Sequence, residues 1–104
     1  MGMVKTKRDV LNVLQGNSAH LHALGVKRIG LFGSFVRDEQ KALSDVDLLV
    51  EFEPGKKTFD NFMELSFFLE ELLQRKVEVV TVEALSPYLG PHILREVQYV
   101  RLAA

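Results

Sequence analysis

Residues 45–52, DVDLLVEF, limit the fold more strongly than any other stretch of this chain. Successive side chains of a β-strand point to opposite faces of its sheet. One face of this run is wholly apolar and suits a core, with Val46, Leu48, Val50 and Phe52. The other face is mostly acidic, with Asp45, Asp47, Leu49 and Glu51. The pattern predicts a strand that covers a core on one side and presents carboxylates on the other.

The rest of the chain predicts helices that alternate with short strands. Strands are expected at residues 26–32 and 76–82, where apolar runs are bounded by turn signals. Helices are expected at residues 6–15, 17–24, 59–74 and 91–100. A short helical turn is expected at residues 34–40, with Ser34 as its N-cap. Strands separated by helices favour an α/β fold with a small sheet flanked by helices.

Length and composition narrow the class of protein. The 104 residues fit one domain, residues 1–104. A net charge of -1 gives no basic field of the kind that nucleic-acid binding needs. The chain has no cysteine, which excludes disulfides and thiolate metal sites and suits a cytoplasmic location. No signal peptide or membrane-spanning run is apparent, so no membrane partner is expected.

The long helix at residues 59–74 has more apolar surface than one sheet can cover. Its large apolar residues, which begin at Phe59 and end at Leu73, spread over most of the helix circumference. A helix lying on one sheet needs an apolar stripe only about 100° wide or somewhat more. Either the helix lies between the sheet and a terminal helix, or Phe67 and its neighbours form part of a homo- or hetero-oligomeric interface.

Asp45 and Asp47 are same-face neighbours on the predicted strand. Two anions held close together repel each other unless a cation lies between them. Mg²⁺ prefers carboxylate oxygens together with substrate phosphates, so this pair is a candidate metal site. The alternative is a strand entry at which Asp45 caps a turn and Asp47 is solvated.

A turn before the acidic pair has the features of a phosphate site. Gly33 lets the backbone approach a ligand closely, Ser34 offers a hydroxyl, and Arg37 offers a guanidinium. Phosphate donors on one side and metal ligands on the other are the two parts that nucleotidyl transfer requires.

Glu78 is the candidate third carboxylate. It is the only acid in the run VEVV, and it would face the aspartates if the two strands are neighbours. It could then serve as a third metal ligand or as the base for the incoming nucleophile. The alternative is an edge strand with Glu78 in water. Glu51 lies too far along the strand from Asp47, about 13 Å, to take this role.

The stretch GSFVRDEQKALSDVD, residues 33–47, has a Gly-Ser pair, ten residues, and then Asp-x-Asp. With its flanking strands, it resembles the minimal nucleotidyltransferase domains of the DNA polymerase β superfamily, and the resemblance spans nearly the whole chain. It implies the polymerase β-like nucleotidyltransferase fold with a small mixed sheet. It also implies Gly33 and Ser34 at the triphosphate of ATP, with Asp45, Asp47 and Glu78 around Mg²⁺.

Arg37 matches a position near the phosphates that is frequently basic in this family. Two residues depart from the family pattern. Asp38 stands where many members have glycine, and Glu78 stands where aspartate is more usual.

Small domains of this family act as antitoxins of helical HEPN-type RNase toxins. The resemblance therefore implies a Mg²⁺-dependent enzyme that transfers AMP from ATP to a tyrosine of such a toxin. Two alternatives stay open from the residues alone. One is a non-catalytic antitoxin that neutralises its partner by contact, and the other is a nucleotide sensor without transfer.

Overall fold

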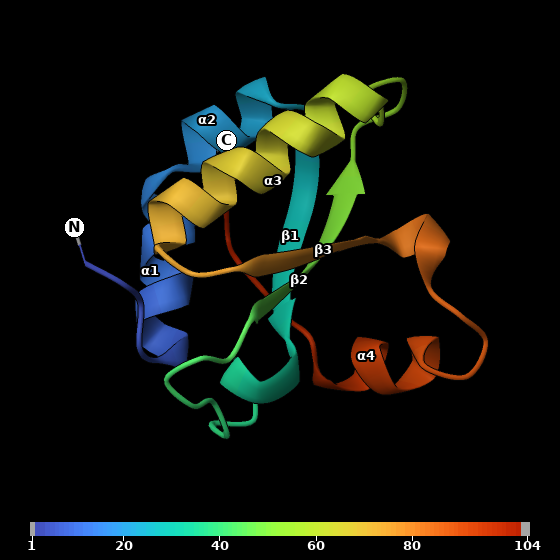
Figure 1. Cartoon of the computed structure of the whole chain (residues 1–104). Coiled ribbons are helices and arrows are strands. Elements are labelled where there is room, and N and C mark those ends of the chain that lie inside the picture. The colour runs from blue at the N-terminus through green and yellow to red at the C-terminus, as the bar shows by residue number, and fades with distance from the viewer. Residues whose placement is uncertain (1, 103–104) are drawn as a thin grey trace.

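The computed structural model describes residues 2–102. The described part contains four helices, two 3₁₀ turns and four strands (Figure 1). In chain order they are α1 (Lys7–Gly16), α2 (Ser18–Ala23), β1 (Val26–Phe32), η1 (Gly33–Phe35), β2 (Val46–Phe52), α3 (Phe59–Leu73), β3 (Val77–Thr81), η2 (Val82–Ala84), α4 (Gly90–Glu96) and β4 (Gln98–Tyr99).

The four strands form one mixed sheet in the order β3-β2-β1-β4. β1 pairs antiparallel with both β2 and β4, whereas β2 and β3 are parallel. Parallel neighbours need a crossover connection, and α3 supplies it between β2 and β3. The α/β fold with a small sheet flanked by helices is therefore confirmed.

Side-chain caps explain where two of the helices begin. Thr6 and Asp9 form a reciprocal capping box at the start of α1. The Thr58 hydroxyl accepts from the amide of Asn61 at 3.1 Å and so caps α3. Gln74 ends α3 in a left-handed conformation, with φ 56°.

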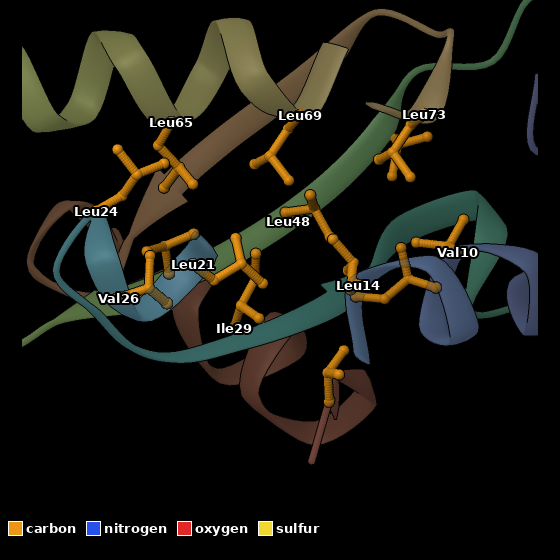
Figure 2. Packing of buried hydrophobic residues seen from close by; sticks show 14 of the residues in the cluster. Val10, Leu14, Leu21, Leu24, Val26, Ile29, Leu48, Leu65, Leu69 and Leu73 are labelled. Carbon is orange, nitrogen blue, oxygen red and sulfur yellow. The ribbon is translucent and has the colours of Figure 1, made fainter. Parts of the chain in front are cut away.

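The core lies between the sheet and the helices α1, α2 and α3. Leu65, Leu69 and Leu73 follow one another at intervals of four residues on α3, so they lie on one face of that helix. Figure 2 shows this row pointing toward Leu48 on β2, with residues of α1, α2 and β1 completing the layer. The other face of β2 carries the carboxylates.

The apolar surface of α3 is covered in part by another helix of the chain. Phe68 packs on the ring of His20 in α2, with 3.8 Å between the ring centroids. Phe67 and Phe59 remain 63% and 78% exposed. The described chain therefore leaves part of this surface uncovered, and an interface at α3 stays a prediction. No helix described within residues 2–102 has the length and apolar character needed to span a membrane.

Two local predictions are wrong. The final helix ends at Glu96 instead of continuing to residue 100, because Gln98 and Tyr99 pair with β1 as a fourth strand. Gly30 makes room for that strand, since a Cβ there would meet side-chain atoms of Val97 and Tyr99.

The turn after β1 also differs from the prediction. It is a single 3₁₀ turn, Gly33–Phe35, and Ser34 lies inside it rather than capping it. The N-cap position is Phe32, which makes no side-chain cap.

Replacing Leu69 with alanine should lower the free energy of unfolding by about 2–5 kcal/mol, because Leu69 is fully buried in the main core. Phe67→Ala, on the same helix but largely exposed, should cost less than about 1 kcal/mol. Urea unfolding followed by circular dichroism measures both. Equal losses for the two variants would contradict the packing described here.

Candidate active site

The register of β2 and β3 places Asp47 beside Glu78 on neighbouring parallel strands. Phe32 of β1 is the partner of Asp47 on its other side. Asp47 is half-buried, whereas Glu78 is exposed because β3 is an edge strand. Glu78 is thus both on an edge strand and next to the aspartate, although the sequence presented these as alternatives.

The surroundings of Asp47 raise its pKa from 3.8 to about 6. Burial is the main cause, followed by the negative charge of Glu78 and a hydrogen bond shared with it. The charge of Asp45 raises the pKa further, and that of Arg37 lowers it. Asp47 therefore holds a proton up to a higher pH than an ordinary aspartate does.

Asp45 lies one residue before β2 and is exposed. Its negative charge is a smaller contribution to the raised pKa of Asp47, after burial and Glu78. Within residues 2–102, no three or more His, Cys, Asp or Glu side chains are grouped closely enough to hold a metal ion. The structure thus shows a close pair, Asp47 and Glu78, with Asp45 at the end of the same strand.

The donor chemistry of this pair fits a divalent cation such as Mg²⁺. Both side chains supply only oxygen ligands, which Mg²⁺ prefers. Burial raises the pKa of Asp47 most, and the negative charge of Glu78 raises it further, so a cation would stabilise the ionised form. A cation bound between the two carboxylates would relieve their repulsion. Asp47 and Glu78 lie close enough together to share it, and Asp45 is the further ligand that the sequence predicts.

Gly33 brings the turn after β1 against the acidic pair. Its φ is +78°, a left-handed conformation that favours glycine. A Cβ at this position would overlap Oδ2 of Asp47. The close approach of backbone to carboxylate therefore requires glycine for two separate reasons.

The predicted phosphate-binding groups surround this turn. Ser34 is partly exposed within η1. Arg37 pairs with Glu39, at 2.9 Å, and with Glu96, at 3.0 Å. Hydrogen bonds to Glu39 and then to Glu96 raise the pKa of the Arg37 guanidinium, so it stays charged.

Asp38 has φ 59°, which accounts for its departure from the family pattern. Glycine adopts this left-handed conformation without steric cost, and aspartate is among the few other residues that tolerate it. The backbone, rather than the phosphate site, thus explains a preference for glycine at this position.

Two residues at the site were missed in the sequence. Glu96 accepts a hydrogen bond from the Gly33 amide at 2.7 Å, although 63 positions separate them. Arg75 donates to the carbonyl oxygens of Ala42 and Ser44 at 2.9 and 3.1 Å, and so holds the loop that leads into Asp45. Nothing local in the sequence marks either residue, because each acts on a segment distant along the chain.

Comparisons with known proteins agree with this geometry. A family model described as the nucleotidyltransferase domain matches residues 14–100. The protein adenylyltransferase MntA of Thermococcus cleftensis is 40% identical over 96 residues, which cover 91% of this chain and 96% of that protein.

Solved structures show the same fold. A chain provisionally assigned as a minimal nucleotidyltransferase is 32% identical, with a TM-score of 0.79, over 93% of this chain and 98% of its own. A chain from a complex described as a tri-AMPylated HEPN toxin of Shewanella oneidensis with an MNT antitoxin has a TM-score of 0.56. It is 20% identical over 86% of this chain and 72% of its own, which shows the fold alone.

This chain belongs to the nucleotidyltransferase domain family. Its mixed four-stranded sheet with flanking helices is the polymerase β-like fold of minimal nucleotidyltransferases.

Gly33→Ala should destabilise the protein more than Gly55→Ala. Both glycines have φ +78°, but nothing lies within 4 Å of a Cβ at Gly55, whereas Asp47 blocks one at Gly33. Gly55→Ala should therefore lower the free energy of unfolding only by the strain of alanine in a left-handed conformation, about 1–2 kcal/mol. Thermal unfolding measures the difference, and similar losses would show that Gly33 does not lie tightly against Asp47.

Asp47→Asn should stabilise the fold at neutral pH. The pKa of Asp47 is about 6 in the folded protein against an ordinary 3.8. The folded state therefore binds more protons between these values, and its stability falls as the pH rises through them. The variant lacks this loss, so its advantage over wild type should be larger at pH 7.5 than at pH 4.

Urea unfolding of both proteins at the two pH values measures this advantage. Using the difference between wild type and variant cancels the titration of groups that do not interact with Asp47. A difference that is independent of pH would mean that the pKa of Asp47 is not raised in the folded protein.

Proposed function

We propose that this chain is a Mg²⁺-dependent nucleotidyltransferase that moves AMP from ATP to a tyrosine of a helical, HEPN-type toxin, and so acts as its antitoxin. The observation that carries the proposal is the in-register pair Asp47 and Glu78, with the Gly33 turn packed against Asp47. The MntA relative, named as a protein adenylyltransferase, supports the choice of AMP and of a protein acceptor.

The residues of the site divide into two groups by charge. Gly33, Ser34 and Arg37 supply an amide, a hydroxyl and a guanidinium, which suit phosphate oxygens. A cation held by Asp45, Asp47 and Glu78 would neutralise charge on the phosphates and polarise them for attack. Amide and guanidinium donors on one side thus oppose carboxylates on the other, as phosphoryl chemistry requires.

Transfer would proceed by in-line attack of the acceptor hydroxyl on the α-phosphorus. The new bond joins the hydroxyl oxygen to that phosphorus, and the bond to the bridging oxygen breaks to release pyrophosphate. Glu78 is exposed at the edge of the sheet, so a macromolecular acceptor can reach it. Its carboxylate would take the hydroxyl proton.

The exposed phenylalanines of α3 support a protein partner. Phe59 and Phe67 are largely exposed on the same helix, and large apolar side chains in water favour association. A non-catalytic antitoxin would use this surface alone. A variant that cannot transfer AMP distinguishes neutralisation by contact from neutralisation by transfer.

Wild-type protein mixed with ATP, Mg²⁺ and its helical partner, encoded by a neighbouring gene, should add AMP to that partner, as intact mass spectrometry would show. Asp45→Asn combined with Asp47→Asn should reduce the transfer rate by at least about a thousandfold, the scale of losing charge stabilisation of the transition state. Glu51→Gln is the matched control, because Glu51 lies on the same face of β2 but pairs with Lys27 and Arg28.

If the double variant neutralises the partner as well as wild type, the non-catalytic function is correct. Saturable ATP binding with no covalent product would favour a nucleotide sensor. Loss of transfer in Glu51→Gln as well would contradict the assignment of Asp45 and Asp47.

A further inference from the structure

Glu96 occupies two hydrogen-bond donors at the Gly33 turn, the Gly33 amide and the Arg37 guanidinium. It is the last residue of α4, a helix that lies apart from α1, α2 and α3, at the end of the sheet near η1 (Figure 1). One carboxylate oxygen accepts from the Gly33 amide at 2.7 Å. Both oxygens accept from Nη1 of Arg37, at 3.0 and 3.1 Å. The Glu96 side chain is only 26% exposed, so the contact is partly shielded from water.

These are the donors that the proposed function assigns to the phosphates of ATP. A carboxylate oxygen and a phosphate oxygen are both anionic acceptors, and both bind backbone amides and guanidinium groups well. The Gly33 amide has a single hydrogen, so it cannot bond fully to Glu96 and to a phosphate at once. The two ligands therefore compete for the same donor.

Charge strengthens the competition. Asp47 and Glu96 already bring two acidic side chains to the turn, and Glu78 lies beside Asp47. Bound phosphates carry the same sign of charge and would repel these carboxylates. Removal of Glu96 from the turn would free the Gly33 amide and part of the Arg37 guanidinium. It would also lower the negative charge beside the nucleotide.

We propose that Glu96 is an internal competitor of the nucleotide, and that ATP must displace its carboxylate from Gly33 and Arg37 in order to bind. This inference rests on the proposed function. Displacement separates the end of α4 from the Gly33 turn, so nucleotide binding and the position of α4 are coupled. Glu96 therefore sets the nucleotide affinity of the site without touching the reacting atoms.

The opposite role for Glu96 makes the opposite prediction. If Glu96 only holds Arg37 ready for the phosphates, its loss should weaken nucleotide binding. The sign of the change in affinity therefore decides between competition and positioning.

The test is isothermal titration of the full chain with a non-hydrolysable ATP analogue and Mg²⁺. Glu96→Gln keeps an acceptor for the Gly33 amide but removes the charge, and Glu96→Ala removes both. We expect Glu96→Ala to bind about tenfold tighter than wild type, the effect of losing one competing charge-assisted hydrogen bond. Glu96→Gln should lie between the two. Thermal unfolding of each variant confirms that it is folded.

Two matched variants control for charge. Glu39→Gln removes an ion pair with Arg37 but leaves the Gly33 amide bound, so it should tighten binding less than Glu96→Ala. Glu64→Gln removes the same charge from an exposed position on α3, which packs on the other face of the sheet, and should leave the affinity unchanged.

Equal or weaker binding by folded Glu96→Ala and Glu96→Gln, with wild type still binding, would overturn the inference and leave the proposed function intact. An equal gain in Glu64→Gln would also overturn it, because a general charge effect would then explain the result. If neither wild type nor any variant binds the analogue, the proposed function is wrong, and the inference fails with it.

Discussion

The parallel pairing of β2 with β3 is the constraint on which the site depends. The register sets Asp47 beside Glu78, and α3 enforces the parallel direction by crossing over the core between the two strands. The leucine row of α3 anchors that crossover against β2 (Figure 2). Packing on the apolar face of the sheet thereby holds Asp47 and Glu78 together on the opposite face, although the two carboxylates repel each other.

The site combines crowded carboxylates with hydrogen-bond donors that attract an anion. On one side, burial and neighbouring charge raise the pKa of Asp47 to about 6. On the other, the Gly33 amide and Arg37 attract an anion, and in this structure that anion is the Glu96 carboxylate. Such an arrangement costs stability, which is common where a protein binds a charged ligand. The substrate of the nucleotidyltransferase family, to which the chain belongs, is a nucleotide, and its phosphates are charged.

The fold could be predicted well from local patterns, and the failures have physical reasons. The alternation in residues 45–52 and the apolar pattern of residues 59–74 are local signals, and the strand and helix that they predict are present. β4 was missed because Gln98 and Tyr99 become a strand only by pairing with the open edge of β1, beside Gly30. Strand pairing is a long-range interaction, which two residues cannot signal on their own.

The sequence by itself determined most of the helices and strands and the types of group at the site: a glycine turn, a basic residue and acids on strands. These follow from local backbone preferences and from the alternation of side chains. Only the tertiary structure decided which groups meet. The strand register brought Glu78 to Asp47, and the path of the chain after α4 brought Glu96 to Gly33. Contacts between distant segments depend on how the whole chain packs, and no short stretch of sequence contains that information.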